Sequence, residues 1–77
     1  MFYKLALIDK SDGSFEWIGS CGVETDARVL AREKILEHYP EQEPPWADIH
    51  QPVHANQMLI GQYMAPGRYT VSIMGCA

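Results

Sequence analysis

The sequence predicts a single α+β domain, a small antiparallel β-sheet of ββαββ order with one helix packed on one face. Three observations lead to this prediction. Apolar residues alternate near both ends of the chain, as in strands; a helical repeat of apolar residues occupies the middle; and 77 residues provide for only one core. The expected elements are a hairpin over 2–21, a helix over 25–39, a proline-rich loop over 40–56 and a hairpin over 57–75.

The first hairpin is expected to present apolar residues on both faces. Its strands cover residues 2–9 and 15–21, and the intervening Lys10–Ser14 contains an Asp-Gly pair that tolerates the positive φ of a tight turn. One face of the first strand is formed by Tyr3, Leu5 and Leu7. In the second strand, Phe15 and Trp17 share one side, and Glu16 and Ile18 share the other. With one helix available, we expect an uncovered apolar patch on the far side of the sheet, made by Phe2, Ala6, Ile8 and Ile18.

The helix carries two apolar stripes. Thr25-Asp26 is expected to cap its start, and Pro40 to end it. The stripe expected to face the sheet is Ala27, Leu30, Ala31 and Ile35. A second stripe, Val29, Leu36 and Tyr39, is separated from it by arginines and needs another cover.

The second half of the chain is harder to assign. After the prolines that follow the helix, the irregular segment is expected to continue to about residue 54. Gln57–Met64 is interpreted as a strand, with a short helix over 53–64 as the alternative. Ala65–Arg68 fits a type II turn, and Arg68–Met74 alternates as a strand should, with Tyr69, Val71 and Ile73 inward and Thr70 and Ser72 outward.

Composition narrows the function classes. The net charge of −4 argues against direct nucleic-acid binding and is compatible with docking on a basic protein surface. The apolar N-terminus is too short for a signal peptide or a membrane span. Two cysteines do not make a disulfide framework, so we expect thiols and a cytoplasmic location, in the host cell if the protein is phage-encoded.

The sequence contains no convincing catalytic or cofactor-binding pattern. The histidines and cysteines lack zinc-site spacing, and no glycine-rich phosphate loop is present. The best enzymatic candidate is Cys21, whose thiol precedes a helix N-terminus, where its pKa could fall. We therefore expect no enzyme, no cofactor and no metal, with a thiol enzyme using Cys21 as an alternative.

The candidate partner-binding residues surround the proline-rich loop. Trp46 follows two prolines, so it could anchor in a partner's pocket or fold back over the second helix stripe. The acidic residues flanking it suit a basic partner. The predicted set is Trp46, Glu41, Glu43, Asp48, Val29, Leu36 and Tyr39.

The order of a hairpin, a helix opening Thr25-Asp26-Ala27-Arg28-Val29-Leu30-Ala31 and closing strands resembles the layout of very small phage-encoded proteins. Among these are anti-CRISPR inhibitors, which bind a bacterial CRISPR effector and block its access to DNA without catalysis. The resemblance covers most of the chain in layout and assigns no binding residues.

The leading hypothesis is therefore a non-catalytic protein-binding module, of the phage inhibitor type, that binds a basic nucleic-acid-binding surface of a host complex. The alternative from a different class is a homodimeric structural or accessory protein, whose surplus apolar surface pairs with a second copy.

Overall fold

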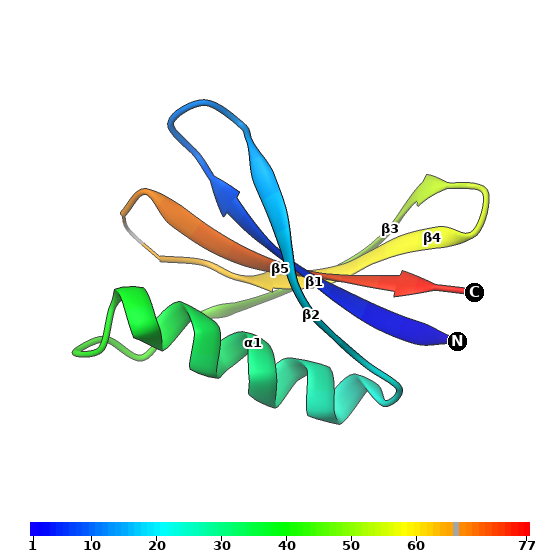
Figure 1. Cartoon of the computed structure of the whole chain (residues 1–77), viewed down its shortest axis with the longest axis horizontal. Helices are drawn as coiled ribbons and strands as arrows, with labels where there is room; N and C mark the ends of the chain where they lie inside the picture. The colour runs from blue at the N-terminus through cyan, green and yellow to red at the C-terminus, as the bar shows by residue number, and fades with distance from the viewer. Residues whose placement is uncertain (66) are drawn as a thin grey trace.

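The computed structural model describes residues 1–65 and 67–77 and confirms the α+β class. One helix crosses one face of a five-stranded antiparallel sheet of order β2-β1-β5-β4-β3 (Figure 1). No helix in these two ranges is long and apolar enough to cross a membrane. The elements are β1 (Phe2–Asp9), β2 (Phe15–Cys21), α1 (Glu24–His38), β3 (Trp46–His54), β4 (Gln57–Tyr63) and β5 (Tyr69–Cys76).

The strand β3 is the main difference from the sequence-based expectation. Residues 46–54 were expected to be irregular, and they pair instead with β4 at the sheet edge. The register shifts twice along this pair, His50 has a φ of 52°, and Pro52 lacks an N–H, so the usual alternation of a strand is broken. The expected loop over 40–56 is therefore wrong over residues 46–54, whereas residues 40–45 are irregular as expected, and the alternative helix over 53–64 is wrong. The expected turn over 65–68 includes Pro66, which lies outside the described residues.

The core lies between α1 and the sheet. Ala27, Ala31 and Ile35 are buried on the helix, above the fully buried Leu5 and Ile73 of the sheet. The two alanines allow the helix to approach the strands closely. Val23 occupies the N-cap position with no side-chain hydrogen bond, so Thr25-Asp26 lies within the first turn and does not cap the helix.

β5 is the central strand, and it is buried on both faces. Its inward residues Val71 and Ile73 are part of the core, whereas Tyr69 is half-buried, and the expected outward residues, Thr70 and Ser72, are buried as well. The Thr70 hydroxyl donates to the carbonyl of Tyr63 (2.8 Å), and the Ser72 hydroxyl donates to the side-chain carbonyl of Gln62 (3.1 Å). These hydrogen bonds satisfy the two hydroxyls within the sheet.

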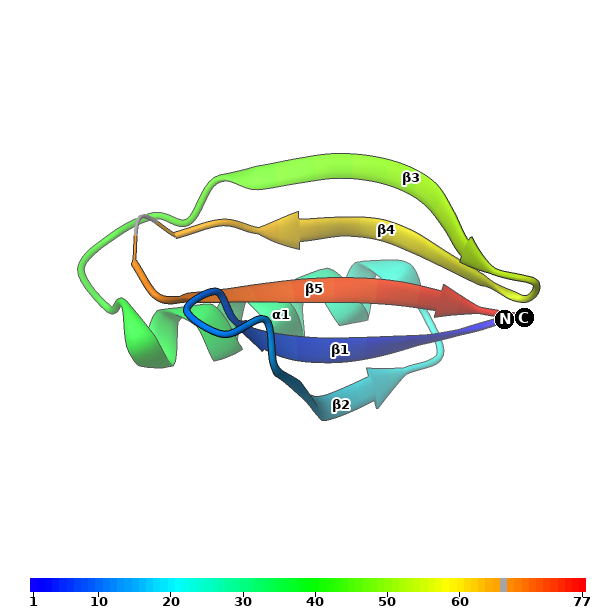
Figure 2. The ribbon, with the colours of Figure 1, turned by 90° about the horizontal axis from the view of Figure 1, so that it is seen from above.

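The sheet face opposite α1 has no covering element in the described chain. The β1–β2 and β3–β4 hairpins rise away from the helix at the two ends of this face (Figure 1), which Figure 2 shows from above with α1 behind it. Ala6 pairs with Trp17 and Ile8 with Phe15, so these four side chains share the open face. Ile18 packs against the core on the helix side, and its expected place in the apolar patch is wrong.

Candidate partner-binding surfaces

Trp46 points into the molecule. Its ring centroid lies 4.9 Å from that of Tyr63, and the guanidinium carbon of Arg28 lies 4.3 Å from the centroid of the indole. The indole N–H donates to Asp48 (2.8 Å). A Cβ built on Gly61 would overlap the ring, so this glycine provides the space for the indole. Trp46 therefore closes the β3 edge against the sheet and the helix.

The acidic residues near Trp46 differ in how far they are neutralised. Glu43 accepts two hydrogen bonds from Arg32, one of them 2.9 Å long from Nε, and these lower the pKa of the Glu43 carboxyl. The Asp48 carboxylate accepts the indole N–H and lies 3.7 Å from the His50 ring nitrogen. Glu41 is exposed on the loop.

The second helix stripe divides into two parts. The Tyr39 hydroxyl accepts a hydrogen bond from the backbone N–H of Tyr69 (2.9 Å), and its half-buried ring packs against the core. Val29, by contrast, is 56% exposed, and Leu36 is partly exposed. Trp46 does not fold back to cover this stripe, because its ring packs on Tyr63, Gly61 and Arg28.

The outer side of α1 combines these two apolar residues with carboxylates. We call it the acidic helix surface, and it comprises Asp26, Val29, Glu33, Leu36 and Glu37. Asp26 and Glu33 are exposed and form no ion pair with any described residue. The arginines on α1 are already engaged, Arg28 by Trp46 and Arg32 by Glu43. Glu37 lies 4.0 Å from Lys34, so the uncompensated negative charge of this surface is that of Asp26 and Glu33.

Sequence reasoning missed the acidic part of this surface. Asp26 and Glu33 fall beside Val29 and Leu36 on a helical wheel, so the 3.6-residue period was sufficient to find them. Asp26 was instead interpreted as part of the helix cap, and Glu33 as an exposed charge of a solvated helix face.

The open sheet face forms a second candidate surface, an apolar groove of about 430 Å³. Phe15 is 59% exposed and packs edge-on against Trp17, with ring centroids 5.3 Å apart. The groove also contains β3 and β4 residues that sequence reasoning did not assign to it, because β3 was not recognised. The groove residues are Ala6, Ile8, Phe15, Trp17, Val53, His54, Gln57, Leu59, Gln62, Ser72 and Met74.

The two sides of the sheet differ in the charged residues that they carry. Of the ten acidic residues, four lie on α1, two on the loop after it and one in the β1–β2 turn. The other three, Asp9, Glu16 and Asp48, lie on strands but on the helix side. Lys4 lies across the open face, 5.1 Å from the Trp17 ring centroid. In the described chain the open face therefore carries no carboxylate.

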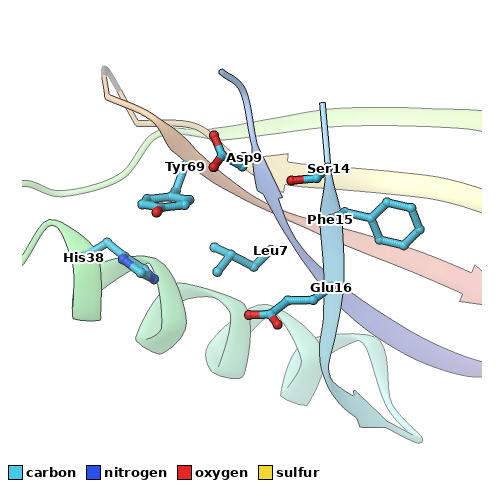
Figure 3. A pocket seen from close by; sticks show the side chains of 7 residues that line it. All are labelled: Leu7, Asp9, Ser14, Phe15, Glu16, His38 and Tyr69. Carbon is cyan, nitrogen blue, oxygen red and sulfur yellow. The ribbon is translucent and has the colours of Figure 1, made fainter. Parts of the chain in front are cut away.

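A smaller pocket of about 390 Å³ lies between the β1–β2 hairpin and the end of α1 (Figure 3). His38 stacks on Tyr69 there, with centroids 4.6 Å apart. Asp9 accepts hydrogen bonds from Arg68 (2.8 and 2.9 Å) and from Ser11, which hold the pKa of the Asp9 carboxyl well below its usual range. The Ser14 hydroxyl donates to Asp12, so it is not paired with His38 as a nucleophile with a base.

Cys21 is separated from the histidines. It is half-buried against the core at the end of β2, and His38 lies at the other end of α1, about 20 Å along the helix axis. His50 and His54 lie on β3, at the opposite edge of the sheet. None of the three forms a nucleophile–base pair with Cys21 here. Within the described ranges no three His, Cys, Asp or Glu residues are grouped as metal ligands.

These surfaces are assigned from geometry alone. Comparison of the chain with protein-family models, curated proteins and solved structures gave no match.

Proposed function

We propose that this protein is a non-catalytic protein-binding module that docks its acidic helix surface on a basic protein surface. The observation that carries the proposal is the uncompensated charge of Asp26 and Glu33 beside the exposed Val29 and Leu36. An interface of this kind gains contact area from the aliphatic side chains and orientation from the carboxylates. Glu41, exposed on the loop after α1, adds to the same negative potential.

We propose further that the basic surface is one that normally binds nucleic acid. Carboxylates spaced along a helix take the positions of phosphates in such a site, and a docked protein then excludes the nucleic acid. This makes the protein an inhibitor of the phage anti-CRISPR type. The net charge of −4, with Arg32 and Arg68 each paired to a carboxylate of the chain itself, supports the acidic character of the module.

The test is affinity capture from a lysate of the source cells, with a double variant and a control of equal charge. Asp26→Asn with Glu33→Gln removes two charges from the acidic helix surface. Asp12→Asn with Glu16→Gln removes two charges from the β1–β2 hairpin, away from the acidic helix surface. We expect one protein to be captured by the wild type and the control and lost with the helix variant.

Two further readouts define the partner. Capture should weaken steeply as salt is raised, because the contact is between opposite charges. Added DNA or RNA should release the captured protein if its basic surface binds nucleic acid. Capture that is equal for all three proteins would overturn the helix assignment, and capture that is insensitive to nucleic acid would overturn the inhibitor assignment.

A further inference from the structure

We infer that the pocket between the β1–β2 hairpin and the end of α1 binds a small organic cation, a guanidinium group on a short aliphatic chain. The pocket shares no residue with the acidic helix surface, so this inference is independent of the proposed partner. Figure 3 shows the Glu16 carboxylate pointing into the pocket from β2 and the His38 ring pointing into it from α1. Three observations carry the inference: the charge of the pocket, its aromatic and apolar lining, and the contacts that hold that lining in place.

The charge of the pocket selects a cation. At pH 7, with histidine neutral, the described residues that line it include two carboxylates, Asp9 and Glu16, and no lysine or arginine. Asp9 is already paired with Arg68, whose Nη2 lies 2.7 Å from Asp9 Oδ2. Glu16 is exposed and forms no ion pair with any described residue. Its charge attracts a cation into the pocket and repels an anion.

The lysines beside the pocket are engaged by other groups of the chain. Lys10, which follows Asp9, donates from Nζ to the carbonyl of Ala65 (2.8 Å). Lys34, one turn before His38 on α1, lies 4.0 Å from a carboxylate oxygen of Glu37. A cation that pairs with Glu16 therefore has to come from another molecule.

The lining of the pocket suits a guanidinium better than a metal ion. In the described chain Asp9, Glu16 and His38 are not grouped closely enough to share a metal ion. The rings of His38 and Tyr69 lie 4.6 Å apart, and the Arg68 guanidinium carbon is 5.4 Å from the Tyr69 centroid, so Tyr69 already contacts one guanidinium. A second guanidinium, which is planar, can contact these rings and donate two parallel hydrogen bonds to the Glu16 carboxylate.

The apolar part of the lining accounts for the aliphatic chain of the ligand. Leu7 is half-buried and packs against the core, and it lines the pocket together with the aromatic rings. Methylene groups attached to the guanidinium can pack on this side chain, as the stem of an arginine packs on apolar surface. The volume of about 390 Å³ lies in the range of small-molecule sites.

Hydrogen bonds hold the pocket in its open form. The backbone N–H of Tyr69 donates to the Tyr39 hydroxyl (2.9 Å), which fixes the strand to the end of α1. The backbone N–H of Lys10 donates to the carbonyl of Arg68 (2.8 Å), which fixes the β1–β2 turn to the same strand. A ligand that enters a preformed pocket does not have to order its walls, so little of its binding free energy is lost.

The test is a titration of the purified ¹⁵N-labelled protein with butylguanidinium, followed by two-dimensional NMR. Butylurea is the matched control, since it has nearly the same shape and no charge. We expect butylguanidinium to shift the amide signals of Leu7, Glu16, His38 and Tyr69 with a dissociation constant of about 1 mM, as befits so small a ligand. Butylurea should leave these signals unchanged, and butylammonium, which lacks the planar fork, should bind more weakly.

Two variants of equal charge locate the site. Glu16→Gln should weaken butylguanidinium binding about tenfold or more, because it removes the paired carboxylate. Glu33→Gln removes an exposed, unpaired carboxylate of the acidic helix surface and should leave binding unchanged. His38→Ala removes a ring from the exposed end of α1 and should weaken binding. The signals of residues distant from the pocket report in each case that the variant is folded.

Three outcomes would overturn the inference: no shift at butylguanidinium concentrations of tens of millimolar, equal shifts with butylurea, or equal weakening by Glu16→Gln and Glu33→Gln. Equal affinity for butylammonium would overturn the choice of a guanidinium. Failure here and failure of the proposed function are separate. The capture control with Asp12→Asn and Glu16→Gln should lose the cation and keep the partner, whereas Asp26→Asn with Glu33→Gln should lose the partner and keep the cation.

Discussion

The two faces of the sheet are made by the same five strands, and they differ in what covers them. On the helix side, Leu5 and Ile73 are fully buried, because Ala27 and Ala31 let α1 lie close above them. On the open side, Phe15 and other large apolar residues stay exposed. In so small a domain, burial depends on a covering element and not on apolar content alone, and the described chain has one helix for the two faces of the sheet.

The largest expected difference between the faces is in the cost of truncating a side chain. Ile73→Ala opens a cavity under α1 and should lower the free energy of unfolding by about 3 kcal/mol, a large part of the stability of a domain this size. Val53→Ala on the open face should cost no more than about 0.5 kcal/mol in the monomer. Urea denaturation at low protein concentration measures both values, and similar costs would contradict the contrast.

A second difference concerns the space beside the core. A Cβ at Gly61 would overlap the Trp46 ring and lie 2.5 Å from the backbone carbonyl oxygen of Ala47, which cannot move aside as a side chain can. Gly61→Ala should therefore cost about 2 kcal/mol and displace the indole. Gly22→Ala is the control, since no atom lies within 4 Å of its built Cβ. Equal unfolding midpoints for the two variants would show that Trp46 is not held against Gly61.

The contact between Arg28 and Trp46 should contribute less. Arg28→Gln removes the guanidinium from the indole face, and we expect a loss of about 0.5–1 kcal/mol. In a Trp17→Phe background, the emission of Trp46 should move to longer wavelength as water reaches the ring. Lys34→Gln, which removes a charge elsewhere on α1, should leave the emission unchanged.

The smallest effect is expected at the ion pair of Asp9 and Arg68, at the rim of the helix side. The pKa of Asp9 is lower in the folded state than in the unfolded state, so the ionised carboxylate stabilises the folded protein at pH values above its unfolded pKa, about 3.9. This stabilisation is lost as the pH falls below that value. Denaturation between about pH 5 and pH 2 should show a shallower loss of stability for Asp9→Asn than for the wild type. Arg68→Gln should flatten the profile in the same way, and a profile unchanged in both variants would refute the coupling.

Local signals predicted the parts of the fold that local forces determine. The Asp-Gly turn gave the first hairpin, and Gly13 has the positive φ of 75° that the turn requires. The spacing of Ala27, Ala31 and Ile35 gave the helix face that is buried. The end strand was recognised from its alternation, although neighbouring strands bury its polar residues too.

The missed features depend on contacts between distant segments. Strand β3 is held by its pairing with β4, and its two bulges hide the alternation that would have revealed it. The position of Trp46 depends on Arg28, on another element, and on the absence of a side chain at Gly61. The acidic residues near Trp46 could be named from the sequence, but their pairing with Arg32 and His50 could not.

The central position of β5 has a consequence for the order in which the chain can fold during synthesis. On the ribosome, β1 and β2 are synthesised before β3 and β4. The two hairpins do not pair with each other, and they become one sheet only when residues 69–76 are available to pair with β1 on one side and β4 on the other. Until then α1 lacks the strand that carries Val71 and Ile73, to which it packs most extensively. The nascent chain therefore exposes two unpaired strand edges, which makes this interval the time when aggregation competes best with folding.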